Sequence, residues 1–193
     1  MEQKNGLLNG VKVLDLTRVL AGPYCGMMLA DMGADVIKVE MPGKGDDSRS
    51  NFPIINGESA YFMNLNRNKK GITLNLKSEQ GKEIFRKLVK ESDIILENYR
   101  PGVMDKLGLG YEELKKINPA IIYGCVSGFG HYGPYSKRAG YDIVGQAMSG
   151  LIKNRRRRKG GCSIGRFNGF SPGNNQHHLF MYWESTPTYR QSI

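Results

Sequence analysis

A regular alternation of strand and helix patterns over the first 126 residues is the feature that most constrains how this chain folds. Short apolar or alternating segments typical of strands lie at residues 11–16, 35–40, 71–76, 93–97 and 120–126. Turn residues and segments with helix signals separate them. Strand followed by helix, repeated at this spacing, is typical of parallel strands joined by right-handed crossovers. The sequence therefore predicts an α/β fold with a doubly wound, mostly parallel sheet.

Three of the intervening segments predict helices. Residues 24–32 form an apolar run behind Pro23, which can open a helix. Ser78 is a suitable N-cap for a second helix, whose apolar residues between 84 and 89 fall on one face. The third helix is expected from Tyr111 to Asn118 and stops at a proline.

The pattern ends near residue 151, and the charge balance changes at the same point. Residues 1–150 carry 20 basic and 17 acidic side chains, a net charge of +3, whereas residues 151–193 carry 8 basic and 1 acidic, a net charge of +7. The second stretch has no sustained period, so we expect it to be irregular and the sheet to be incomplete on its C-terminal side. We predict a domain at 1–151 and a basic tail at 152–193. We hypothesise that the tail comes from a shifted reading frame or is unrelated to the domain.

Several classes of protein are excluded or disfavoured. No apolar run approaches the roughly 18 residues of a membrane-spanning helix, and the first ten residues lack the apolar centre of a signal peptide. Cys25, Cys125 and Cys162 lie far apart and give neither a disulfide framework nor a metal-ligand spacing. We expect a soluble, cytoplasmic protein with no metal and no permanently bound cofactor.

Candidate binding residues lie in the loops after the strands, because open α/β sheets bind ligands at the carboxyl ends of their strands. Four such loops, at residues 17–23, 75–77, 98–102 and 128–130, contain glycine or basic residues, or both. Basic side chains in or near them are suited to phosphates: Arg18, Lys77, Arg100, Lys106, Lys137 and Arg138. The alternative is that these are ordinary turns and solvated charges.

The common nucleotide motifs are absent. The turn after the first strand, LAGPYCG at residues 20–26, lacks the G-x-G-x-x-G spacing of a dinucleotide site, so Glu40 at the end of the second strand is weak support for a ribose contact. No P-loop sequence occurs either. Nucleic-acid binding by the basic run at 155–159, with the nearby aromatic residues Phe167, Phe170, Tyr182 and Trp183 as stacking platforms, is a further alternative. Such a run is more often solvated, so specific recognition of nucleic acid is not expected.

A series of motifs runs in order over about residues 7–151. They are LNGVKVLDL at 8–16, AGP at 21–23, LADMGADVIKVE at 29–40, NRNKK at 66–70, ENYRPG at 97–102, LGLGY at 107–111, NP at 118–119, SGFG at 127–130 and GYD at 140–142. Together they resemble the N-terminal part of the class III CoA-transferases, the CaiB/BaiF type. The family includes transferases for formate, carnitine, succinate and similar acids, and the α-methylacyl-CoA racemases. The resemblance implies a Rossmann-like CoA-binding domain. It also implies an acyl-CoA and a small carboxylic acid as substrates, and a homodimer for a full-length chain.

The resemblance also implies which residues contact CoA. By matching positions they are Leu20, Ala21, Leu74, Asn75, Leu76, Lys77, Asn98, Tyr99, Arg100, Lys106 and Arg138. Met41 is left out because many members of the family have an arginine there, and the methionine provides no cation.

The same resemblance implies a reaction. In the family an aspartate attacks the acyl-CoA thioester, the released thiolate forms an aspartyl-CoA thioester, and the acceptor acid opens it. Tyr141 stands where the racemases have a histidine base, which favours the transferases over the racemases, since tyrosine is a poor base at neutral pH.

No residue is assigned as catalytic. Residues 151–193, where the family's nucleophile lies, contain no aspartate, and Asp105 and Asp142 match structural positions. We therefore expect a truncated, inactive chain, with a non-catalytic CoA-binding remnant or a basic-tailed polyanion-binding module as alternatives.

Overall fold

The fold divides into two units. The computed structural model describes residues 6–148 and 181–183. The first unit comprises residues 6–126 together with 181–183, and the second comprises residues 127–148. Among the described residues, no helix is both long enough and apolar enough to span a bilayer.

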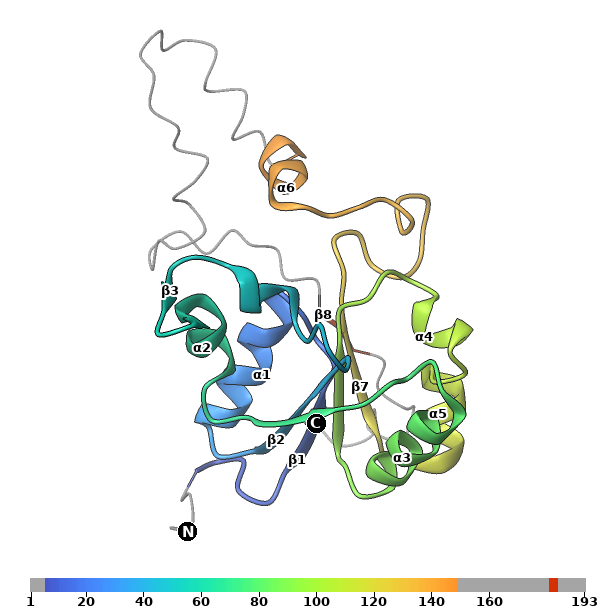
Figure 1. Ribbon diagram of the computed structural model, residues 1–193. Coiled ribbons are helices and arrows are strands. Elements are labelled where there is room, and N and C mark those ends of the chain that lie inside the picture. Colours follow the sequence, from blue (N-terminus) through green and yellow to red (C-terminus); the bar gives the residue numbers. More distant parts are fainter. Residues whose placement is uncertain (1–5, 149–180, 184–193) are drawn as a thin grey trace, which may run out of the picture. The chain divides into compact units, whose positions relative to one another are not determined.

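A single sheet organises the first unit (Figure 1). Its strands, in spatial order, are β5 Lys70–Thr73, β2 Asp35–Glu40, β1 Lys12–Asp15, β6 Ile94–Glu97, β7 Ile122–Val126 and β8 Met181–Trp183. The first five are parallel to their neighbours, and β8 runs antiparallel to β7. The five strands expected from the sequence are confirmed, and so is the parallel sheet.

Helices cover both faces of this sheet. The elements outside it are α1 Ala21–Asp31, the 3-10 helix η1 Asp47–Ser50, the hairpin strands β3 Ile54–Ile55 and β4 Glu58–Ser59, α2 Ala60–Asn66, α3 Glu79–Lys90, α4 Val103–Lys106 and α5 Tyr111–Ile117. Figure 1 shows α1 and α2 on one side of the sheet and α3 and α5 on the other. This is the doubly wound arrangement that the alternating pattern predicts.

The core has two parts because neighbouring residues in a strand point to opposite faces. Leu14 of β1 and Ile95 of β6 belong to one apolar cluster, which also contains Phe85 of α3. Val13 and Leu96, each one position away, belong to the other. Burial on both faces explains why these strands are apolar almost throughout.

Two element boundaries lie three residues from the position expected from the sequence. Strand β5 ends at Thr73, three residues early, because the Asn75 side chain accepts a hydrogen bond from the Lys77 N–H and turns the chain. Helix α1 begins at Ala21 and not at Tyr24. Pro23 therefore lies within its first turn, where its missing N–H costs nothing.

The expectation of an irregular C-terminal stretch is wrong for three residues. Residues 181–183 form β8, in register with Gly124–Val126 of β7. Their sequence, Met-Tyr-Trp, contains two aromatic residues that favour strands, and β7 would otherwise be the edge of the sheet. The basic run at 155–159 lies outside the described residues, as do Phe167 and Phe170.

The second unit consists of a loop followed by α6 Asp142–Met148. Gly128 and Gly140 lie so close that a Cβ on Gly128 would be 2.3 Å from the Gly140 Cα, so glycine is required at this contact. In the loop between these glycines, the Tyr135 ring contacts the Phe129 ring edge to face. The Arg138 guanidinium lies 4.1 Å from the centroid of the Tyr135 ring.

Candidate functional site

The strand order places a topological switch between β1 and β6. From β1 the chain proceeds to β2 and β5 on one side, and later to β6 and β7 on the other. The loops after β1 and β6 therefore lead away in opposite directions. In folds of this kind, a crevice between two such loops at the carboxyl edge of the sheet is the usual ligand position. Residues 16–20 and 98–102 form these two loops.

A reciprocal pair of hydrogen bonds joins the two loops. The Arg18 N–H donates to Asn98 Oδ1 at 2.8 Å, and Asn98 Nδ2 donates to the Arg18 carbonyl at 2.7 Å. One side-chain amide thus satisfies both backbone groups of one residue. It ties the loop that leads into Leu20 and Ala21 to the first residue of the loop after β6, and the grouping of these residues into one CoA site stays a prediction.

The same place carries an exposed cation and an aromatic ring. The Arg18 guanidinium lies 5.1 Å from the centroid of the Tyr99 ring and 3.4 Å from Asp47 Oδ2. Burial raises the pKa of Tyr99, and the positive charge of Arg18 only partly opposes this, so the phenol is neutral at physiological pH. A cation beside a neutral ring is suited to a ligand with both phosphates and an apolar part.

A buried ion pair lies beneath the loop after β1. Lys38 Nζ is 2.8 Å from Asp46 Oδ2, and the two side chains are 2% and 0% exposed. Burial acts to raise the pKa of Asp46, but the hydrogen bonds from Lys38 and Ser48 outweigh it and leave that pKa below its usual value. Sequence reasoning missed this pair. Its only signal is a lysine between two apolar residues, Ile37 and Val39, in the middle of β2.

The carboxylate of Glu40 already has hydrogen-bond partners within the protein, which does not support a role as a ribose contact. Its two carboxylate oxygens accept hydrogen bonds from the Arg49 guanidinium at 2.8 and 2.7 Å, and one of them also accepts the Asp46 N–H at 2.8 Å. Burial opposes ionisation, yet these bonds leave the pKa of Glu40 lowered. The carboxylate fixes the loop after β2.

A second buried pair joins the end of β1 to α1 and α2. Lys69 Nζ lies 2.8 Å from Asp15 Oδ2 and also donates to the Pro23 carbonyl and to Asn66 Oδ1. Burial lowers the pKa of Lys69 even though Asp15 opposes the shift. Asp15 also accepts hydrogen bonds from the Thr17 N–H and hydroxyl. The NRNKK motif at 66–70 therefore supplies a structural anchor.

Glu97, the last residue of β6, is a fourth buried acid at this edge, after Asp46, Glu40 and Asp15. Burial raises its pKa to about 7, although a hydrogen bond from the Tyr99 N–H at 2.7 Å and one with the Cys125 thiol act in the opposite direction. The carboxyl group directly precedes the loop at 98–102. Sequence reasoning did not single it out, because a glutamate at a strand end is usually exposed.

The other predicted residues are placed less closely. The segment 74–77 follows β5, two strands from β1 on the same edge of the sheet. Its leucines pack against the core, whereas Asn75 and Lys77 are exposed. Lys106 is exposed on α4. Arg138 belongs to the second unit, so its grouping with the other residues stays a prediction.

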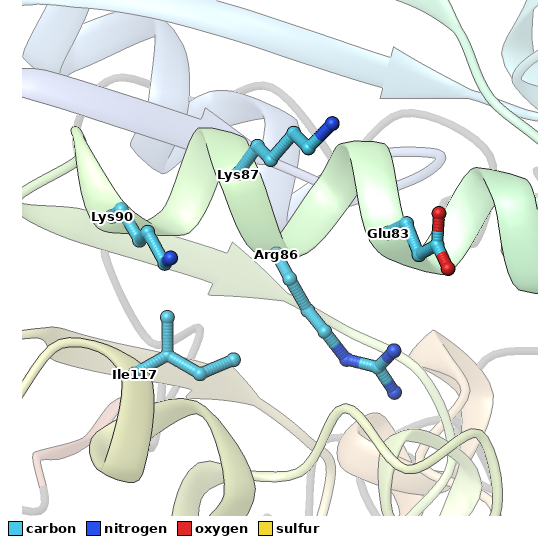
Figure 2. A pocket seen from close by; sticks show the side chains of 5 residues that line it. All are labelled: Glu83, Arg86, Lys87, Lys90 and Ile117. Atoms are coloured by element: carbon cyan, nitrogen blue, oxygen red, sulfur yellow. The ribbon is translucent and has the colours of Figure 1, made fainter.

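A shallow pocket lies on the surface of α3 and α5. Its volume is about 310 Å³, and Figure 2 shows the side chains that line it: Glu83, Arg86, Lys87 and Lys90 of α3, and Ile117 of α5. None of the predicted CoA-binding residues is among them. The pocket is therefore separate from the loops after β1 and β6.

Comparison with known proteins identifies what the chain is similar to. A family model described as CoA-transferase family III matches residues 8–163. The match extends twelve residues past the domain boundary expected at 151, and that boundary stays a prediction.

The relatives agree with one another. Succinyl-CoA:glutarate CoA-transferase of Mus musculus is 54% identical over 146 residues, which are 75% of this chain and 34% of that protein. Acetyl-CoA:oxalate CoA-transferase of Acetobacter aceti is 50% identical over 147 residues, 76% of this chain and 38% of that protein. The crystal structure of a CaiB/BaiF family protein from Brucella suis has a TM-score of 0.74 at 47% identity and matches 82% of this chain and 44% of its own. The chain spans a little over a third of the length of these two curated relatives.

Proposed function

Because the chain belongs to CoA-transferase family III, we propose that it binds coenzyme A or an acyl-CoA in the crevice between the loops after β1 and β6. In a complete enzyme this site would serve the transfer of CoA between an acyl-CoA and a free carboxylic acid. The identity of the two acids is not part of the proposal, since the relatives named above differ in their substrates.

The observation that carries the proposal is the Arg18–Asn98 pair. It ties the loop that leads into α1 to the first residue of the loop after β6, at the switch point of the sheet. The first N–H groups of a helix have no partner within the helix and favour an anion. With Arg18 and Arg100 nearby, this arrangement suits the phosphates of CoA, and the apolar parts of Leu20 and Tyr99 suit its adenine or pantetheine.

The proposal separates binding from turnover. We propose that the 193-residue chain by itself binds CoA but does not transfer it, since residues 151–193 contain no aspartate. Asp105 is exposed on α4, outside the crevice loops. An assay with acyl-CoA donors and free carboxylic acids is expected to give no turnover. Turnover by a preparation free of other CoA-transferases would contradict this part. The homodimer that the resemblance implies for a full-length chain is a further prediction, which analytical ultracentrifugation of a full-length chain tests.

The binding part is tested by calorimetric titration of the chain with CoA. Asn98→Ala removes both bonds to Arg18, so we expect CoA affinity to fall by about tenfold or more, as for about 1.4 kcal/mol of lost binding free energy. Asn118→Ala is the matched control. Asn118 likewise bonds backbone groups, donating to the carbonyls of Val89 and Ser92 at the opposite edge of the sheet. Absence of CoA binding by the parent chain, or an equal loss in both variants, would refute the proposal.

A further inference from the structure

The backbone of Val19 has a conformation that valine strongly disfavours, at the point where β1 leads into α1. Its φ is 71°, in the left-handed region, which β-branched residues rarely adopt. Such a conformation persists only where the surroundings over-determine it, and it is commonest at functional sites. Val19 as a whole is 43% exposed, so its own packing is not the main restraint.

The restraint comes from a buried carboxylate. The Val19 N–H donates to Asp46 Oδ1 at 3.1 Å, and the same oxygen accepts the N–H and hydroxyl of Ser48 at 2.9 and 2.8 Å. Asp46 thus begins η1 and holds the neighbouring loop at the same time. A carboxylate that accepts three hydrogen bonds has a well-defined position.

Lys38 completes the restraint. It neutralises Asp46 at 2.8 Å and also donates to the Thr17 carbonyl at 2.8 Å. The buried ion pair therefore forms hydrogen bonds with the backbone of two residues of the loop, Thr17 and Val19. The Asn98 side chain forms two hydrogen bonds with the backbone of Arg18, the residue between them. Hydrogen bonds thus fix the backbone of three consecutive residues. These residues set the direction of the chain as it continues into Leu20 and Ala21.

We propose that Asp46, supported by Lys38, is a positioning residue for CoA binding. Its side chain is fully buried, so it acts through the Val19 backbone, which presents Leu20 and Ala21 to the ligand. This inference rests on the proposed function, since it assigns a role in the same site. It adds that a buried ion pair with no ligand contact controls affinity.

A matched pair of substitutions at Val19 tests the positioning without disturbing the ion pair. Both Val19→Gly and Val19→Pro remove the valine side chain. Glycine adopts a positive φ readily and keeps the N–H, whereas proline is locked near −65° and has no N–H. In calorimetric titration with CoA we expect Val19→Pro to bind at least about tenfold more weakly than Val19→Gly, because misplacement of a positioning group by about 1 Å can be that costly.

Substitution of Asp46 gives the second measurement. Asp46→Asn keeps an oxygen that can accept the Val19 N–H, whereas Asp46→Ala does not. We expect fast hydrogen exchange of the Val19 amide and weak CoA binding in Asp46→Ala, with both recovering toward the parent values in Asp46→Asn. Asp93→Asn is the control, because Asp93 accepts the Lys12 N–H at the opposite edge of the sheet.

The outcomes separate the two proposals. If the parent chain does not bind CoA, the proposed function is wrong. If the parent binds CoA but Val19→Pro and Val19→Gly bind equally well, or Asp46→Ala binds like the parent, Asp46 is a structural residue only and the positioning role is overturned.

Discussion

Polar side chains tie backbone segments together at both edges of the sheet, but the two edges differ in charge and burial. At the amino edge, where the parallel strands begin, the Asn118 side-chain amide donates hydrogen bonds to the carbonyls of Val89 and Ser92. The Lys70–Asp35 ion pair at the same edge is largely exposed. At the carboxyl edge, the pairs Lys38–Asp46 and Lys69–Asp15 are almost fully buried.

The difference indicates what each edge is for. Neutral hydrogen bonds and exposed ion pairs, at points where helices end and strands begin, contribute to stability with little desolvation cost. Buried ion pairs carry a desolvation cost that often exceeds their attraction, so stability alone does not explain them. They are explained if the loops that they fix must keep one geometry for a ligand.

The largest effect is expected from breaking a buried pair at the carboxyl edge. Asp15→Ala leaves the Lys69 ammonium buried without its carboxylate, and it also removes the acceptor of the Thr17 N–H. We expect the free energy of unfolding to fall by about 3–5 kcal/mol. Urea denaturation measures it, and a loss below about 1 kcal/mol would mean that the two edges do not differ.

A second effect concerns pH, because burial raises the pKa of Glu97 to about 7 from 4.5. Between these values the folded chain holds a proton that the unfolded chain has lost, so this group makes stability fall as pH rises from about 4.5 to about 7. Glu97→Gln cannot ionise, and we expect it to be more stable than the parent at pH 8 by about 1–3 kcal/mol. At pH 4 the two should be similar. An equal difference at both pH values would contradict the raised pKa.

A smaller effect is expected from Asn118→Ala at the amino edge. The substitution leaves the Val89 and Ser92 carbonyls without this donor, and we expect a loss of about 1–2 kcal/mol, typical of removed hydrogen bonds. CoA affinity should not change. Altered CoA affinity in a variant that remains folded would remove the functional distinction between the edges.

The smallest effect is expected from Asp35→Ala, which breaks the exposed pair with Lys70 at 2.8 Å. Exposed ion pairs contribute only about 0–1 kcal/mol, and salt screens them. Thermal melting at low and high salt should show a difference between parent and variant that shrinks as salt is added. A loss as large as that of Asp15→Ala would show that burial is not the deciding variable.

The sheet could be predicted from the sequence, since strands buried on both faces have a distinctive apolar pattern and segments with helix signals separate them. The hairpin of β3 and β4 was not predicted, because two-residue strands carry no periodic signal. The end of β5 was misplaced because Leu74 and Leu76 continue the strand's alternation, although they pack against the core from a turn.

The candidate site was predicted in part. The loops after the strands can be located from the order of strand and helix patterns along the chain. The residues around Arg18 and Asn98 could therefore be predicted. The ion pairs beneath them were not found, because Lys38 and Asp46 are eight residues apart and alternation along a strand does not show which polar side chain is buried. Val19 gave no signal either, since a positive φ is usually inferred from glycine.

The central claim is that CoA binds in the crevice at the carboxyl edge of the sheet, and an amide NMR titration with CoA tests it most directly. The account predicts the largest shift changes at Arg18–Ala21 and Asn98–Arg100, with little change at Lys12 and Ala120 of the amino edge. Changes confined to the α3 and α5 residues around the pocket of Figure 2, or no saturable change at all, would contradict it.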